Sequence, residues 1–122
     1  MTEKTETTNG RHPSNDGVVM LADLASRLLE SARDHHSQRA AETINSGPSM
    51  RATVIALAAG AELAEHESPP AATLQVIVGR TELRSARQTW LVHEGEIVAI
   101  PAERHALSAI TDAVVLLTVA LH

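Results

Sequence analysis

Two histidines, His66 and His105, have the residue type and the setting best suited to chemistry in this chain of 122 residues. Neutral imidazole nitrogens bind transition metals, and they also orient small molecules by hydrogen bonding. A protein-held metal needs three or four ligands, so two histidines alone are too few. Ser68 and Gln75 offer further polar groups close to His66 in the sequence. The candidate ligand-binding residues are therefore His66, Ser68, Gln75 and His105, and the candidate metal ligands are His66 and His105.

The composition argues against several other kinds of chemistry. The chain has no cysteine, which excludes disulfides, thiolate metal sites and cysteine nucleophiles. It has no Gly-x-Ser-x-Gly motif, so nothing in it supports a serine hydrolase. A net charge of −5 and scattered basic residues argue against nucleic-acid binding. The polar N-terminus lacks a secretory signal, and the longest apolar run, 114–121, is too short to span a bilayer. We therefore expect a cytoplasmic protein that binds no membrane.

One helix is expected ahead of the β-strands. Residues 1–17 are polar and are predicted to form a disordered tail. Within residues 18–37, apolar side chains recur at the spacing of one helical face, and residues 14–16 offer oxygens for an N-cap. The Asp-His-His triplet at 34–36 resembles a metal-binding motif, but it has no companion acidic motif. A helix C-terminal cap is the favoured interpretation of this triplet.

The rest of the sequence has the pattern of an all-β domain. Short alternating or apolar runs are separated by turn residues, which indicates a sandwich or a barrel. Without Phe or Tyr, and with a single Trp, the interior must be filled by Val, Leu, Ile and Ala. The predicted strands span residues 39–44, 51–58, 73–78, 80–84, 88–92, 96–100, 105–109 and 113–121.

Each of the two histidines lies in a block that begins with a glycine, and the first of these blocks closes at Gly79. In the first block, Gly60 is followed by five residues and then by His66. In the second block, Gly95 is followed by five residues and Pro101, and His105 comes shortly afterwards. Together these blocks resemble the paired sequence motifs of the cupin family.

The resemblance to cupins covers roughly residues 39–122 and implies a fold. It implies an antiparallel β-barrel of two facing sheets (a double-stranded β-helix, or jelly roll) with the helix added outside, so that residues 18–122 form the cupin domain. Cupins hold a metal or a small molecule in the mouth of the barrel. The resemblance therefore implies Fe, Mn, Ni or Zn as possible metals. Cupins also commonly pair, so a homodimer is expected.

The sequence departs from the cupin motifs at the positions that normally hold the metal. Ser68 stands where the family has its second histidine. Ala72, counted back from Gly79, stands where the family has its glutamate, and an alanine side chain ligates nothing. In the second block, Glu103 replaces the usual glycine before His105. The resemblance therefore implies a cupin with a degenerate metal-binding motif.

The alternation of side chains along a strand predicts which residues share a face. If the chain around His66 is extended, His66 and Ser68 lie on the face opposite to the neighbouring glutamates, which then face water. The same alternation turns Leu74 and Val76 inward and Gln75 outward. A bulge at the Pro69-Pro70 pair would reverse this order and bring Gln75 into the lumen.

Three residues outside the two blocks are given surface or packing roles. Trp90 is expected to pack with its apolar neighbours, with ligand stacking as the less favoured alternative. His93 is expected to be an exposed turn residue. Alternation puts Arg104 on the face opposite to His105, where it belongs to the surface.

Three functions remain open at this point. The favoured function is the binding of a small molecule in the barrel lumen without a full catalytic metal site. The first alternative is a metal-dependent oxygenase or isomerase that uses His66 and His105 together with a third ligand. Gln75, Glu67 and His93 are considered for that ligand, but the spacing supports none of them well. The second alternative is a non-catalytic scaffold whose barrel is filled by its own side chains.

Overall fold

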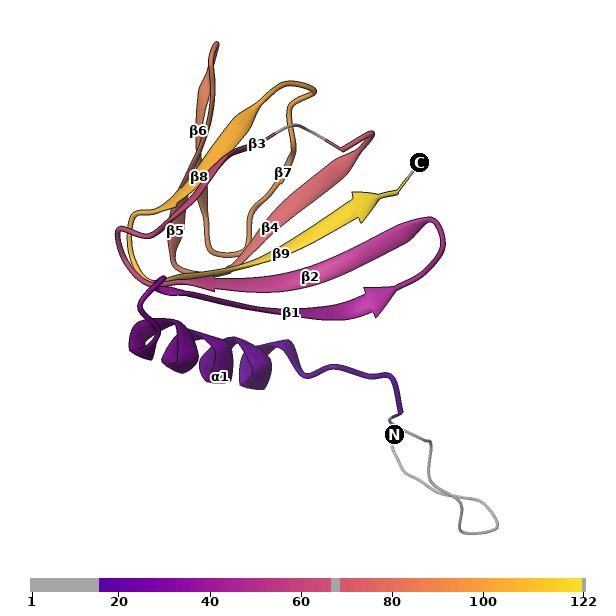
Figure 1. Cartoon of the computed structure of the whole chain (residues 1–122), viewed down its shortest axis with the longest axis vertical. Coiled ribbons are helices and arrows are strands. Elements are labelled where there is room, and N and C mark those ends of the chain that lie inside the picture. The colour runs from indigo at the N-terminus through magenta and orange to yellow at the C-terminus, as the bar shows by residue number, and fades with distance from the viewer. Residues whose placement is uncertain (1–15, 67–68, 122) are drawn as a thin grey trace, which may run out of the picture.

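The computed structural model describes residues 16–66 and 69–121 of the chain. In this part of the chain, one helix is followed by strands that alternate between two sheets (Figure 1). The elements are α1 (Leu21–Asp34), β1 (Arg39–Ser46), β2 (Met50–Leu57), β3 (Glu62–His66), β4 (Ala72–Val78), β5 (Arg80–Ser85), β6 (Thr89–His93), β7 (Ile97–Ala99), β8 (His105–Ala109) and β9 (Ala113–Ala120).

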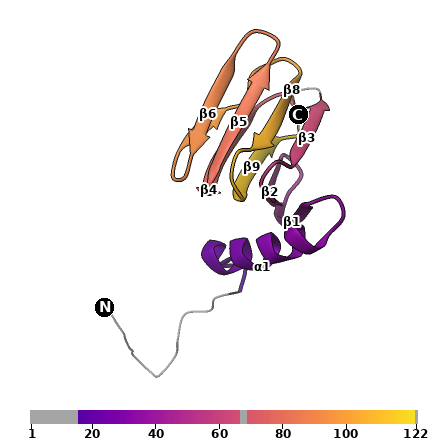
Figure 2. The same ribbon diagram turned by 90° about the vertical axis from the view of Figure 1, so that its left-hand side faces the viewer.

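The strands form two facing antiparallel sheets, which confirms the predicted all-β barrel. One sheet has the strand order β1-β2-β9-β4-β7, and the other has the order β3-β8-β5-β6. The chain crosses between the sheets several times, so strands distant in sequence become neighbours, as β2 and β9 do over their full length. Figure 2, turned by a quarter, shows the four-stranded sheet in front and α1 below it.

Aliphatic side chains from both sheets form a hydrophobic core between them. Because successive side chains of a strand point to opposite faces, every second residue of these strands enters the core. On β5, for example, Thr81 and Leu83 are fully buried, whereas Arg80 is exposed and Glu82 is only partly buried. The buried members of this core are Ile55, Leu57, Leu74, Val76, Leu83, Val92, Leu107, Ala109, Ala113 and Val115.

The helix α1 covers part of the outer face of the five-stranded sheet. Leu24, Leu28 and Ala32 are buried there against side chains of β2 and β9, such as Val54 and Val114. These helix residues recur every three or four positions, which is the spacing of one helical face. The apolar stripe predicted from the sequence is therefore the stripe that attaches the helix to the barrel.

The helix is shorter than the predicted range of 18–37. It begins at Leu21, after Met20, whose side chain makes no capping hydrogen bond, and it ends at Asp34 with His35 as its C-cap residue. Val18 is 68% exposed and precedes the buried stripe, so packing does not hold it in a helix, and a β-branched side chain does not favour one. Most of the predicted tail, 1–15, lies outside the described residues. No helix of the described chain has the length and apolar content needed to cross a membrane.

Candidate ligand site at the open end of the barrel

His66 and His105 are directly opposite each other in the four-stranded sheet. His66 is the last residue of β3 and His105 the first of β8, and the register of these antiparallel strands pairs the two positions. A register shift lies between Leu63 and His66, so β3 contains a bulge just before the histidine. Both positions lie at the open end of the barrel, where β3 ends and β4 and β8 begin (Figure 1).

The His105 side chain is buried, with 4% of its surface exposed, in spite of its polarity. It follows the inward alternation of Leu107 and Ala109 on β8, which are core residues. Its Nδ1 atom lies 3.0 Å from the backbone oxygen of Glu103. Because a carbonyl oxygen only accepts hydrogen bonds, Nδ1 must carry the proton and donate it. In the neutral ring, Nε2 is then the basic nitrogen, which binds a proton donor or a cation.

Two further polar side chains of β5 lie on the inner side of the four-stranded sheet. Thr81 is fully buried, and its hydroxyl donates to the backbone oxygen of Val92 at 3.0 Å. Ser85 is partly buried and is paired in register with His105. Its Oγ accepts from the backbone N–H groups of Arg87 and Gln88 at 3.3 Å, which holds the turn after β5.

Ser85 was not among the residues singled out from the sequence. It directly follows the predicted strand 80–84, and a serine next to a turn is too common to indicate a binding residue. Its position opposite His105 makes it part of the wall of the candidate site.

The prediction that Gln75 enters the lumen is wrong. Gln75 is exposed on β4 between buried Leu74 and Val76, so it lies on the outer face, as simple alternation requires. The register shift that β4 does contain falls between Val76 and Val78, after Gln75, and therefore does not turn it inward. The fourth candidate, Ser68, lies outside the described residues.

The described residues do not offer a full set of metal ligands. No group of three or more His, Cys, Asp or Glu side chains is close enough to hold one ion within the part of the chain that the structure describes. Ala72 begins β4 at the open end, in the position that corresponds to the cupin glutamate, and its methyl group has no donor atom. A catalytic metal normally has three protein ligands and an open position. This donor set therefore does not fit such a metal.

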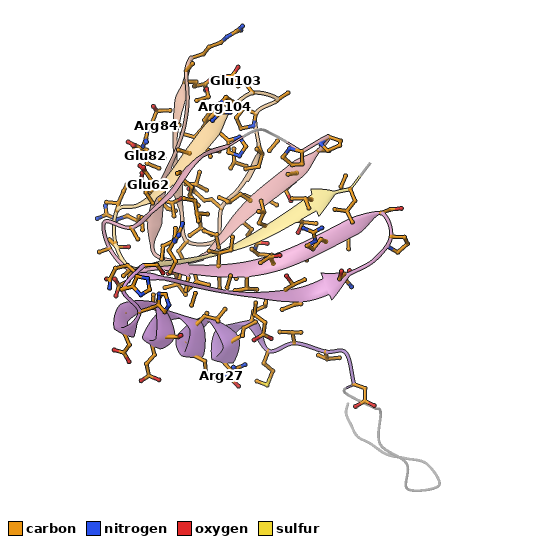
Figure 3. All side chains as sticks on the ribbon, in the orientation of Figure 1. Arg27, Glu62, Glu82, Arg84, Glu103 and Arg104 are labelled. Atoms are coloured by element: carbon orange, nitrogen blue, oxygen red, sulfur yellow. The ribbon has the colours of Figure 1, made fainter. Side chains whose placement is uncertain are left out.

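A cluster of charged side chains on the four-stranded sheet lies on the opposite face from His105. Arg84 pairs with Glu62 at 2.9 Å and with Glu82 at 3.5 Å, and Ser108 donates to Glu62 at 2.8 Å. Figure 3 shows Glu62, Glu82 and Arg84 gathered along the outside of this sheet. The hydrogen bond from Arg84 lowers the pKa of the Glu62 carboxyl. Arg84 offsets part of the charge of the two carboxylates on the surface, and the cluster is separate from the candidate site.

Comparisons with known proteins were informative only at the level of structure. Neither a family model nor a curated protein matches the sequence. The fold is similar to a conserved protein of unknown function from Streptococcus pyogenes, with a TM-score of 0.66, 29% identity, and coverage of 72% of this chain and 78% of that chain.

Two other solved structures name their fold. One is an RmlC-like cupin from Desulfovibrio desulfuricans, with a TM-score of 0.61, 22% identity, and coverage of 67% of this chain and 81% of that chain. The other is a cupin-2 domain containing protein from Shewanella frigidimarina, with a TM-score of 0.68, 16% identity, and coverage of 87% of this chain and 97% of that chain. At these identities the likeness shows a common fold.

Proposed function

Because this chain is a small protein of the cupin fold, we propose that it binds a small molecule at the open end of its barrel. His105 and His66 orient the ligand, Ser68 adds a hydroxyl, and aliphatic side chains at this end of the barrel contact its apolar part. One fold hosts many unrelated activities, so the proposal depends on the side chains of this end and not on the fold.

The observation that carries the proposal is the buried imidazole of His105. Its Nδ1–H donates to the Glu103 backbone oxygen at 3.0 Å, which fixes both the orientation of the ring and the position of its proton. A mostly apolar site with a few oriented polar groups is the usual form of a small-molecule site. The favoured ligand is therefore a molecule with polar groups at one end and an apolar body.

The metal-dependent oxygenase or isomerase remains the second candidate function. It is supported by the pairing of His66 with His105 in register, because two histidines on adjacent strands are a common part of a metal site. Against it stands Ala72, which removes the carboxylate that would complete the set. This candidate requires a ligand from outside the described residues.

The first experiment measures the metal content of the purified protein by elemental mass spectrometry. We expect no stoichiometric Fe, Mn, Ni or Zn after incubation with each ion. The same preparation is then screened by thermal shift against a library of small neutral and polar molecules. A ligand of the proposed site should raise the Tm of the wild type, by mass action, and have a much smaller effect on the His66→Ala and His105→Ala variants.

A His93→Ala variant is the matched control, because His93 is exposed and lies on β6, away from the pair. It should respond to the ligand as the wild type does. Metal bound at one equivalent and lost from both His66→Ala and His105→Ala would replace the proposal with the metal-dependent enzyme. If no compound raises the Tm and no metal binds, the scaffold function is favoured instead.

A further inference from the structure

A pocket with a volume of 440 Å³ lies between the edges of the two sheets, away from the histidine pair. β6 is the last strand of the four-stranded sheet, and β7 is the last strand of the five-stranded sheet. The two strands diverge from the turn that joins them (Figure 1). Residues of both strands and of the turn line the pocket, and neither His66 nor His105 is among them.

The only tryptophan of the chain lines this pocket. Trp90 is partly buried, packs against the core between the sheets and is also a lining residue of the pocket. Val92 and Val98 add an apolar floor. This volume and lining are within the range found for small-molecule sites, which span about 300–1,000 Å³ and are mostly apolar.

Two large aliphatic residues of the pocket lining are exposed. Leu91 on β6 is 60% exposed, and Ile97 on β7 is 62% exposed. Both line the pocket. Large apolar side chains that gather at a hollow, with an aromatic ring beside them, indicate a binding surface more strongly than isolated exposed leucines do.

The one charged side chain in the lining is a carboxylate. Oε1 of Glu96 accepts a hydrogen bond from the backbone N–H of His93 at 2.8 Å, which fixes the carboxylate at the end of the pocket. No lysine or arginine lines the pocket. The whole chain carries a net charge of −5, so its field also attracts cations.

We propose that this pocket, named here the β6–β7 pocket, binds an apolar organic cation such as an alkyl- or arylammonium. The ring of Trp90 attracts the cation through its negative face, since tryptophan is the best of the aromatic side chains for this contact. Glu96 provides the opposite charge. The aliphatic lining takes the hydrocarbon part of the ligand. The site is distinct from the open-end site proposed above and does not depend on it.

The test uses benzyltrimethylammonium chloride as the probe and Trp90 emission as the signal. Because the chain has one Trp and no Tyr, its emission comes from Trp90 alone. The Trp90 emission should change saturably as the cation is added. The neutral benzyl alcohol and the anionic benzenesulfonate should bind about tenfold more weakly or not at all.

Two charge-neutralising variants distinguish the effect of the pocket carboxylate on probe binding from the effect of the net charge of the protein. Glu96→Gln keeps an amide oxygen for the His93 N–H but loses the carboxylate, and it should weaken binding of the probe about tenfold. Glu94→Gln is the control. Glu94 lies in the same turn and does not line the pocket, and its substitution removes the same charge. It should bind nearly as the wild type does.

Three results would overturn the proposal. They are the absence of saturable binding of the cation, equal binding of the cation and the neutral alcohol, and equal effects of Glu96→Gln and Glu94→Gln. Loss of binding in Trp90→Leu, measured by calorimetry and with the fold checked by circular dichroism, would support it. His105→Ala should leave probe binding unchanged, so failure of the open-end site and failure of this pocket are distinguishable.

Discussion

Gly79, in the turn between β4 and β5, is the residue with the least room for a side chain among the described glycines. Its backbone has φ +86°, a conformation that side chains with a Cβ rarely adopt. A Cβ added there would overlap the backbone oxygen of Asp112 and press on the Thr111 hydroxyl. Gly95 has a similar φ of +84° but no heavy atom within 4 Å of an added Cβ. A substitution at Gly95 therefore tests backbone strain alone, whereas a substitution at Gly79 tests backbone strain together with steric overlap.

The substitution Gly79→Ala should lower the free energy of unfolding by about 3 kcal/mol, since left-handed strain and overpacking both contribute. Gly95→Ala should lower it by about 1 kcal/mol, from the left-handed conformation alone. Urea denaturation of both variants at pH 7 measures the difference. Equal losses in the two variants would mean that the chain around Asp112 moves aside without cost.

The orientation of single side chains at the candidate site could be predicted from the sequence only in part. Strand alternation correctly placed Leu74 and Val76 inside, and it also placed Gln75 outside. The wrong prediction for Gln75 came from adding a bulge at Pro69-Pro70. The sequence carries no direct mark of a bulge, because a bulge depends on how the partner strand is paired.

At the scale of elements, Asp112 connects the helix to the barrel. It lies in the turn between β8 and β9, and its carboxylate pairs with the Arg33 guanidinium near the end of α1 at 2.7 Å. Its other oxygen accepts from the Ala59 backbone N–H at 2.8 Å. The Ala59 hydrogen bond, and then the one from Arg33, lower the pKa of the Asp112 carboxyl. One side chain thus joins three segments that are far apart in sequence.

Acid should remove the contribution of Asp112 to stability. A carboxyl whose pKa is lower in the folded state stabilises the fold above its unfolded pKa of about 3.9, and this effect is lost as the pH falls through the folded value. At pH 7, Asp112→Ala should cost about 1 kcal/mol, and Asp112→Asn should cost less because its amide oxygen still accepts from Ala59.

The difference in unfolding free energy between the wild type and Asp112→Asn should therefore shrink below about pH 4. Urea titrations of both proteins across this range measure it, and the subtraction cancels the other carboxyls. A difference that stays constant down to pH 2 would show that the charge of Asp112 is not what stabilises the contact.

Strands were more predictable from this sequence than the helix boundaries. Eight of the strands were predicted within about two residues, the usual uncertainty of such boundaries, because alternation and turn residues mark them locally. The predicted strands do not include β3, which contains a register shift between Leu63 and His66. The order of the strands in the two sheets was not predicted, because it depends on pairings such as β2 with β9 that no local pattern records.

At the scale of the whole molecule, α1 covers only part of the outer face of the five-stranded sheet. The rest of that face has a shallow apolar groove with a volume of 530 Å³. Small side chains of β4, β7 and β9 line it, including Thr73, Ala99 and Thr118, with Met50 of β2 at its side. We propose that a second copy of the chain covers this groove in a homodimer, because exposed apolar surface of this kind is commonly an interface.

Light scattering after size exclusion should give a mass of twice 13.0 kDa. Thr118→Arg should shift the protein toward the monomer, because it buries an unpaired charge in the interface. Ser26→Arg adds the same charge at an exposed position of α1 and should leave the dimer intact. A monomer at every concentration, or equal effects of the two variants, would contradict a dimer through this groove.

The central position of β9 has a consequence for the newly made protein. β9 lies between β2 and β4 and pairs with both, although more than thirty residues separate it from either in the sequence. During synthesis, β2 and β4 therefore each have one unpaired edge until residues 113–120 have been synthesised and have left the ribosome. Until then the nascent chain presents two strand edges that can pair with other chains. Assistance from a chaperone would be of most value during this interval.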